Sequence, residues 1–288
     1  MANERGEIGS IVGRIRRKYD ELPPSERRLA DLILDFPGDI ASYSATELAE
    51  LAGASKAAAT RLVQRLGFTS YDEARRSARD AQDWGSPLFL LRKESDAAVE
   101  PARELKRHLE RDIANMTRTF EALDPDLLDE IVDAMIGARR LWLLGYRNSH
   151  ILASYACSQF LLVRDDVRLL PPGVETLAEY LAGMDGGDLL VIVGFRRRLQ
   201  QLRRTMKAAA ATGVPILYIT DPTAGRTAAL AKWTLYCEVG GVGALDSYSS
   251  AIALVHYLGV AMVRRAAGAG RRRLKRIEDL HEDLRDFD

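Results

Sequence analysis

The sequence predicts a two-domain protein: an all-α N-terminal domain, then an α/β domain with a five-stranded, parallel, doubly wound sheet. Apolar residues recur with helical spacing through roughly the first 80 residues. After about residue 140, short and nearly continuous apolar runs alternate with helical stretches, as in parallel sheets covered on both faces. A length of 288 residues is enough for two hydrophobic cores.

Five helices are expected in the N-terminal domain. The first spans residues 8 to 20 and the second follows Pro23-Pro24, a pair that suits a helix start because a missing amide costs least there. A pair of short helices between Ser44 and Phe68 and a further helix from about Tyr71 to Gln82 complete the unit. The apolar stripes of the first two helices consist of Ile8, Ile11, Val12, Ile15 and Tyr19, and of Leu29, Leu32, Ile33 and Phe36.

The segment from Ser44 to Phe68 has the signals of two helices joined by a sharp turn. Ser44 and Glu47 have the spacing of a capping box. Gly53 can adopt positive φ after the first helix, and Ser55 can cap the second. We expect Leu48 and Leu51 to point inward from the first helix. The second helix should bury a stripe made of Ala59, Leu62, Val63 and Leu66.

The opposite face of this second helix carries side chains suited to a DNA major groove. A guanidinium can fork onto guanine, an amide can pair with adenine, and small residues permit close approach. Between residues 55 and 79, six cations oppose two acids, a local charge of +4. An ordinary helical hairpin with a solvated basic face is the alternative. The predicted DNA-binding residues are Lys56, Ala57, Thr60, Arg61, Gln64 and Arg65.

The α/β domain is predicted from five apolar runs, at residues 140–145, 167–170, 188–194, 215–220 and 233–239. Helices are expected at 149–163, 176–182, 199–212 and 226–231, with a long closing helix over 246–267. The predicted domain boundaries are 1–83 for the helical domain, 84–125 for a linker that contains a helix from Pro101 to about Phe120, 126–270 for the α/β domain, and 271–288 for a charged tail.

Composition excludes several classes of protein. The formal net charge is zero, so any DNA contact must come from a local basic patch. Cys157 and Cys237 lie in apolar surroundings, which favours two buried thiols in a reducing cytosol over a disulfide framework. The N-terminus lacks the apolar segment of a secretory signal, and no apolar run is long enough to span a membrane. We therefore expect a cytoplasmic protein without a membrane anchor, structural metal or cofactor.

Ligands of open parallel sheets bind beyond the carboxyl ends of the strands, where helix N-termini offer free amides. Three such places can be named: residues 145–149, 194–198 and 220–223. The second is unusual because Arg196, Arg197 and Arg198 follow the strand directly and could clamp a phosphate or carboxylate. The alternative is that these arginines pair with acidic neighbours or remain solvated. The sequence from Gly240 to Gly243 is interpreted as a turn beside the site, because it lacks dinucleotide-loop spacing.

With these motifs the chain resembles the RpiR-type bacterial transcriptional regulators, whose second domain has the SIS (sugar isomerase) fold. The resemblance covers most of the chain. It is carried by LPPSERRLADLILDFPGDI, SATELAELAGAS and RLVQRLGFTSYDEARRSARD in the first domain, and by GYRNS and ATGVPILYITD in the second. One departure is Ala58, where the family often has threonine.

The resemblance implies a regulator that binds a double-stranded operator and answers to a small anionic effector, with a sugar phosphate as one candidate, and that acts as a homodimer or homotetramer. It also implies that Ser149 contacts phosphate. At the family's second phosphate motif this chain has Gly194, Arg196, Arg197 and Leu199, so the usual hydroxyls are gone. The predicted effector-binding residues are Arg147, Ser149, Glu175, Arg196, Arg197, Arg198, Asp221 and Asp246.

An enzyme is the alternative function. Aldose–ketose isomerisation needs a positioned base, and Glu175 and His256 are the candidates. We interpret His256 as a core residue of the last helix, because the stretch around it is apolar. Since the phosphate hydroxyls are also missing, no catalytic residue is predicted.

Overall fold

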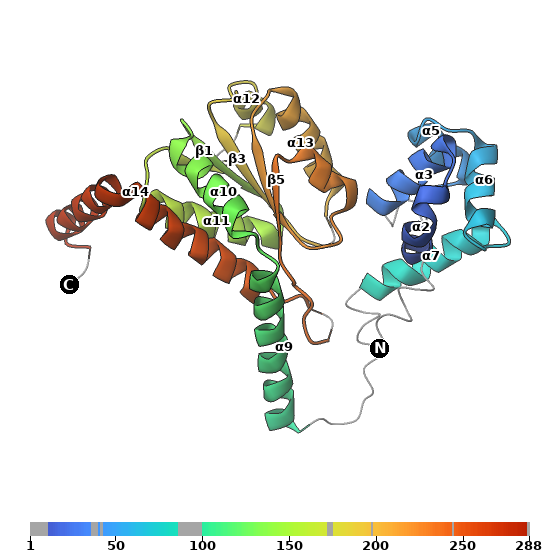
Figure 1. Ribbon diagram of the computed structural model, residues 1–288, viewed down its shortest axis with the longest axis horizontal. Coiled ribbons are helices and arrows are strands. Elements are labelled where there is room, and N and C mark those ends of the chain that lie inside the picture. Colours follow the sequence, from blue (N-terminus) through green and yellow to red (C-terminus); the bar gives the residue numbers. More distant parts are fainter. Residues whose placement is uncertain are drawn as a thin grey trace. The chain divides into compact units, whose positions relative to one another are not determined.

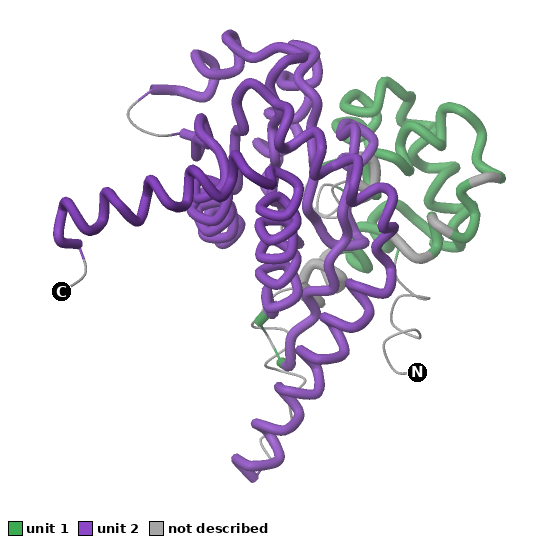
Figure 2. Tube along the Cα trace, turned by 60° about the vertical axis from the view of Figure 1, so that its left-hand side comes forward, with its two compact units in different colours: residues 1–98, 243–245 green, residues 99–242, 246–288 purple. Residues whose placement is uncertain are grey.

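The computed structural model describes residues 11–35, 40, 43–85, 100–171, 175–196, 198–243 and 245–286. The chain forms two compact units (Figure 2). One comprises residues 1–98 with 243–245, and the other comprises residues 99–242 with 246–288. The first has one hydrophobic core, and the second has two, one on each face of a sheet.

The first unit is helical (Figure 1). Its described elements are α2 (Ile11–Lys18), the 3₁₀ turn η1 (Tyr19–Glu21), α3 (Pro24–Asp35), α5 (Ala45–Leu51), α6 (Lys56–Arg65) and α7 (Tyr71–Gly85). Helix α3 begins at Pro24, as the proline pair predicts. The stripe predicted for α6 is confirmed, since Ala59, Leu62, Val63 and Leu66 are all buried. The predicted stripe residues Ile8 and Phe36 lie outside the described residues.

The prediction that Leu51 points inward is wrong. Leu48 and Ala49 are buried, whereas the side chain of Leu51 is 57% exposed. Because the α-helix turns about 100° per residue, Leu51 lies about 200° around the axis from Ala49. A short helix that buries both Leu48 and Ala49 therefore turns Leu51 outward.

The second unit contains the predicted five-stranded parallel sheet, with strand order β2-β1-β3-β4-β5. The strands are β1 (Leu141–Gly145), β2 (Val167–Leu170), β3 (Leu189–Gly194), β4 (Ile216–Thr220) and β5 (Trp233–Tyr236), each within one or a few residues of its predicted run. Strand order reverses at β1, because β2 lies on one side of it and β3, β4 and β5 on the other. Parallel sheets of this order bind ligands at that reversal.

Helices cover both faces of the sheet. Alternation along β1 is typical: Leu141 and Leu143 face one core, while Trp142 and Leu144 face the other. The first core is closed by α10 (Pro125–Gly137), α11 (Asn148–Leu161) and α14 (Ser249–Leu284). The second is closed by α12 (Leu177–Leu181), α13 (Gln200–Ala211) and the 3₁₀ helix η2 (Gly225–Leu230). The result is a three-layer α/β/α sandwich.

Helix α9 (Pro101–Glu121) is part of this second unit. Asn115 and Thr119 are buried, Asn115 donates to the Gly240 carbonyl (2.9 Å), and the amide of Glu238 donates to the Thr119 hydroxyl (2.9 Å). The segment predicted as a linker, 84–125, is thus divided between the two units, and its residues 86–99 lie outside the described part of the chain.

The closing helix α14 is longer than predicted. It was expected to end at Ala267, before a charged tail over 271–288, but it continues to Leu284. Ala267 has non-helical angles (φ 44°, ψ −116°), so a break does occur at the predicted end. Helix resumes because the following Arg, Leu, Lys and Glu residues are good helix formers, and because Arg273 donates to the Leu161 carbonyl (2.8 Å) at the end of α11.

Other expectations concern thiols, metals and membranes. Cys237 is buried, as predicted, whereas Cys157 is only half-buried, and both are free thiols. Within the described residues, no group of three or more His, Cys, Asp or Glu side chains is arranged to hold a metal ion. None of the described helices has the length and apolarity needed to cross a membrane.

Gly145 at the end of β1 should not tolerate a side chain. A Cβ there would lie 2.2 Å from the Ser149 carbonyl oxygen and 2.8 Å from the His150 amide nitrogen, so the backbone would have to move. We expect Gly145→Ala to lower the free energy of unfolding by at least about 2 kcal/mol. Gly137→Ala is the matched control, because nothing lies within 4 Å of its Cβ position. Urea denaturation of both variants tests this, and equal stabilities would contradict it.

Candidate functional site

The local geometry of α5 and α6 follows the sequence signals. The Glu47 carboxylate accepts from the Ser44 amide (2.8 Å), and the Ser44 hydroxyl accepts from the Glu47 amide (3.3 Å), which completes the predicted capping box. These bonds hold the pKa of Glu47 below its usual value. Gly53 has φ +60°, and the Ser55 hydroxyl accepts from the Ala58 amide (3.2 Å). Two helices joined by a tight turn are therefore present.

The predicted DNA-binding residues lie on the outer side of α6. Lys56, Ala57, Arg61, Gln64 and Arg65 are exposed. Thr60 is half-buried, and its hydroxyl donates to the Lys56 carbonyl (3.2 Å). The structure thus brings an amide, two guanidinium groups and an ammonium group together on one helix.

Two of these cations contact a buried carboxylate that the sequence analysis did not identify. Glu26 of α3 is buried, and the Nε atoms of Arg65 and Arg61 lie 2.8 and 3.6 Å from its carboxylate oxygens. Glu26 lies on the same side of α3 as the buried residues Leu29, Ala30 and Ile33, three, four and seven positions later. It therefore occupies a core position of α3. A carboxylate on an apolar stripe needs a charged partner. That signal was available in the sequence.

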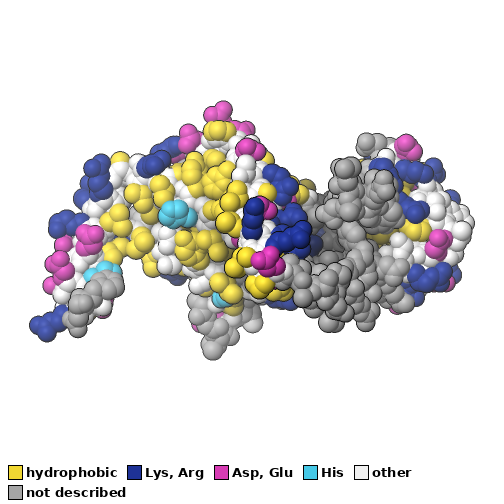
Figure 3. All heavy atoms as spheres, turned by 90° about the horizontal axis from the view of Figure 1, so that it is seen from below, with side chains coloured by type: hydrophobic (Ala, Val, Ile, Leu, Met, Phe, Trp, Pro, Cys, Tyr) yellow, Lys and Arg dark blue, Asp and Glu magenta, His cyan; other side chains and the backbone are white. Residues whose placement is uncertain are grey.

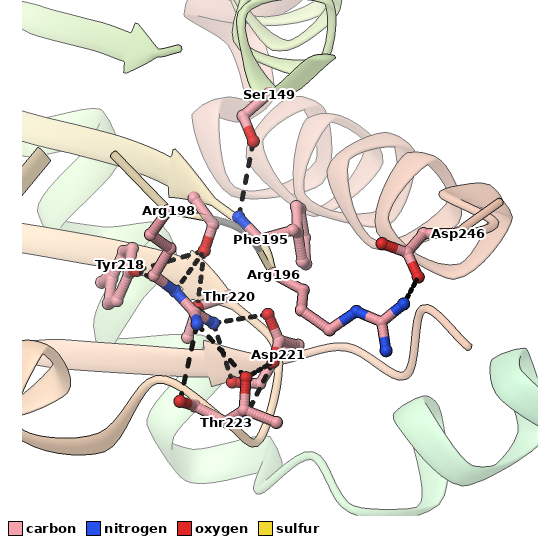
Figure 4. A network of polar contacts seen from close by, with 10 residues as sticks. Ser149, Phe195, Arg196, Arg198, Tyr218, Thr220, Asp221, Thr223 and Asp246 are labelled. Carbon is pink, nitrogen blue, oxygen red and sulfur yellow. Dashed lines mark hydrogen bonds and ion pairs between the residues drawn. The ribbon is translucent and has the colours of Figure 1, made fainter. Parts of the chain in front are cut away.

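A second group of polar residues lies where β1 and β3 end (Figure 4). The Ser149 hydroxyl, in the first turn of α11, accepts from the Phe195 amide after β3 (3.4 Å). Arg147, between β1 and α11, is exposed and has φ +56°, a conformation that is strained for any residue except glycine. Strain of this kind at a strand end is typical of binding sites.

Arg196 extends toward α14 from the same place. It pairs with Asp246 (2.6 Å), whose side chain is only 13% exposed. Tyr248 packs against Phe195, with ring centroids 5.5 Å apart. Burial, and next the charge of Asp246, raise the pKa of Tyr248, while the charges of Arg147 and Arg196 oppose that shift. Arg147 and Arg196 thus both act electrostatically on Tyr248.

Arg198 points the other way, toward the end of β4 (Figure 4). Its Nε donates to the Tyr218 hydroxyl (2.9 Å), its Nη1 donates to the Thr223 hydroxyl (3.2 Å), and its Nη2 donates to the Thr220 hydroxyl (2.8 Å). Nη2 also makes a close ion pair with Asp221. The side chains of Arg198 and Asp221 are only 13% and 4% exposed. All three guanidinium nitrogens therefore have protein acceptors.

The remaining candidates are Glu175, Arg197 and His256. Glu175 is exposed and accepts from the Tyr180 hydroxyl (2.9 Å). Arg197 is not among the described residues. His256 was interpreted as a core residue, which is wrong, because it is exposed while its neighbour Val255 is buried. The buried side of α14 is formed by Ala251, Leu254, Val255 and Leu258, and His256 lies on the exposed side together with Ile252 and Tyr257.

The two units match two family models. Residues 9–80 match the helix-turn-helix domain of the rpiR family, and residues 134–261 match the SIS domain. The transcriptional regulator HexR of Pseudomonas aeruginosa is 24% identical over 73% of this chain and 73% of its own length.

Solved structures share the fold. The sugar isomerase domain of an RpiR transcription factor from Sphaerobacter thermophilus is 24% identical, with a TM-score of 0.57 over 60% of this chain and 97% of that chain. The Vibrio vulnificus NanR protein, solved in complex with ManNAc-6P, is 17% identical, with a TM-score of 0.59 over 95% of this chain and 98% of that chain.

The Arg198–Asp221 pair should stabilise the fold. Asp221→Asn would leave the Arg198 guanidinium largely buried without its counter-charge, so we expect a loss of about 3 kcal/mol in the free energy of unfolding. Asp185→Asn is the control, because Asp185 pairs with Arg139 at the surface, where its side chain is 58% exposed. That change should cost less than about 1 kcal/mol. Similar losses in both variants, measured by urea denaturation, would contradict a structural role for Arg198.

Proposed function

The chain is a transcriptional regulator that joins an RpiR-type helix-turn-helix domain to a SIS domain, and we propose that it binds an operator through α6 and senses a small anionic metabolite at the ends of β1 and β3. The observation that carries the proposal is that one chain holds both an exposed polar and basic helix and a pair of arginines at the strand-order reversal. Such a protein works on DNA in the cytoplasm.

The DNA-reading part of the proposal rests on α6. Its exposed residues include Gln64, which can pair with adenine, and Arg61, which can fork onto guanine. The Glu26 carboxylate pairs with the Nε atom of Arg65 and lies close to the Nε atom of Arg61. These contacts limit the rotation of both arginine side chains. We assign base reading to Arg61 and Gln64, phosphate contact to Lys56, and an orienting role to Arg65.

Replacing both base readers should abolish sequence preference. We expect Arg61→Ala with Gln64→Ala to weaken operator binding by at least about 2 kcal/mol, or roughly 30-fold, because each paired contact is worth 1–3 kcal/mol. The operator is first selected from a pool of random duplexes with the wild-type chain, and affinity is then measured by fluorescence anisotropy.

Arg76→Ala on α7 is the control, since it removes one exposed charge outside α6. It should change binding by a few-fold only, with a slightly smaller salt dependence. Thermal unfolding of the double variant checks that the contact with Glu26 is not needed for folding. If the folded double variant selects the same sequences with the same affinity, α6 does not read the operator.

The sensing part of the proposal rests on Arg147 and Arg196. Arg198 is occupied by Asp221 and three hydroxyl groups, so it supports the loop instead of offering a free cation. Arg147 is exposed at a strained position, and Arg196 is 39% exposed in its pair with Asp246. The Ser149 hydroxyl and the amides at the start of α11 lie at the same strand end. Cations and amides together suit a phosphate or carboxylate group.

Removing both arginines should abolish anion binding without unfolding the domain. Arg147→Gly removes the charge and relieves backbone strain, and Arg196→Gln keeps a donor for Asp246. The probes are inorganic phosphate, hexose 6-phosphates and sugar acids, tested by thermal shift. A ligand at 100 times its Kd stabilises the wild-type fold by about 2.7 kcal/mol.

We expect at least one of these anions to raise the melting temperature of the wild-type chain and to have no effect on the double variant. Arg204→Ala, which removes an exposed cation from α13, should respond like wild type. An undiminished shift in the Arg147→Gly, Arg196→Gln variant would place the anion elsewhere.

A further inference from the structure

The end of α14 carries a charge order that pairing within the helix explains only in part, through the Lys275–Asp279 ion pair (3.0 Å). Beyond the break at Ala267, exposed cations come first and exposed acids follow. A helix favours acids near its N-terminus and cations near its C-terminus, so this order opposes the helix dipole. Figure 1 and Figure 2 show this part of α14 extending away from the sheet, and Figure 3 shows that the surface of the second unit carries both basic and acidic side chains.

Charged residues that lie seven positions apart in this segment have opposite signs. Each exposed cation between residues 271 and 276 is followed seven residues later, two turns along the same side, by an exposed acid. The four pairs are Arg271 with Glu278, Arg272 with Asp279, Lys275 with Glu282, and Arg276 with Asp283. An identical helix that runs in the opposite direction therefore meets opposite charge along this segment, whereas a parallel one meets like charge.

The same segment has an apolar face. Ile277, Leu280 and Leu284 fall at i, i+3 and i+7, the spacing of one helical stripe. Leu280 is 47% exposed and Leu284 is 69% exposed. The start of the segment is attached to the α/β unit, because Arg273 donates to the Leu161 carbonyl (2.8 Å) at the end of α11 and makes a close ion pair with Asp165. An anchored helix with exposed leucines and self-complementary charges is suited to pairing.

We infer that residues 271–284 of α14 pair antiparallel with the same segment of a second copy of this chain. The twofold axis passes near Ile277, midway between Arg271 and Asp283. The contact is isologous, so each copy supplies the basic half to the acidic half of the other. This inference rests on α14 alone and is independent of the proposed operator and anion.

Cysteine cross-linking in the full chain tests the orientation. In a Cys157→Ser background, which leaves only the buried Cys237, Ile277→Cys lies next to the axis and should form a disulfide-linked dimer under mild oxidation. Leu284→Cys is the matched control on the same stripe. Antiparallel pairing separates the two copies of residue 284 by about 21 Å along the helix axis, so this variant should not form a cross-link.

Equal cross-linking of both variants would indicate parallel pairing, and no cross-linking of Ile277→Cys would exclude the contact. Either result overturns the inference.

Charge reversal tests the complementarity. In the Ile277→Cys chain, changing Arg271, Arg272, Lys275 and Arg276 to Glu sets acid against acid and should lower cross-linking more than about tenfold. Changing Glu278, Asp279, Glu282 and Asp283 to Lys should do the same. Mixing the two variants should restore cross-linking, because one chain is then acidic and the other basic throughout. Failure of the mixture to recover, with both variants folded by circular dichroism, would overturn the inference.

Discussion

The chemistry of the second unit depends on two strands that both end in glycine. At Gly145 the α11 backbone approaches so closely that a Cβ would lie 2.2 Å from the Ser149 carbonyl oxygen. At Gly194 a Cβ would lie 2.5 Å from Leu202 and 3.1 Å from the Tyr218 hydroxyl. The approach at Gly145 lets the Ser149 hydroxyl reach the Phe195 amide, and the approach at Gly194 lets α13 and β4 pack against the end of β3. The candidate anion site exists because neither strand end carries a side chain.

The arginine-rich turn after β3 divides its described cations between two tasks. Arg198 lies under the loop, where its guanidinium ties the ends of β3 and β4 together through Tyr218, Thr220 and Asp221. Arg196 lies at the surface, where it pairs with Asp246 and remains in contact with solvent. Burial decides the difference, because a guanidinium that is 13% exposed must satisfy its donors within the protein, whereas one that is 39% exposed can exchange a carboxylate for a ligand.

Most of the fold could be predicted from the sequence, because its signals are local. The capping box at Ser44, the turn at Gly53 and the five apolar runs each depend on residues within a few positions of one another, and the structure confirms them. The exposure of Leu51 and His256 was predicted wrongly. In both cases the sequence showed an apolar neighbourhood, but which side of a helix faces the core is decided by the elements packed against it.

The sites were harder to predict because they depend on contacts distant in sequence. The three consecutive arginines gave no indication that Arg198 would turn toward Asp221 and Arg196 toward Asp246, since those partners lie 23 and 50 residues away. Glu26 contacts Arg65 across 39 residues. Only its place on the apolar stripe of α3 hinted that a carboxylate would be buried there.

If the second unit is the sensor, an anion bound at the ends of β1 and β3 should control operator binding by the helix-turn-helix domain. The most direct measurement is the operator affinity of the full-length chain, by fluorescence anisotropy, with and without the anion that gives the largest thermal shift. A saturating anion should change the operator Kd by about 5–150-fold, as expected for coupled sites. Operator DNA should change the anion Kd by the same factor. An operator Kd that is unchanged while the anion is bound would show that the two sites are not coupled.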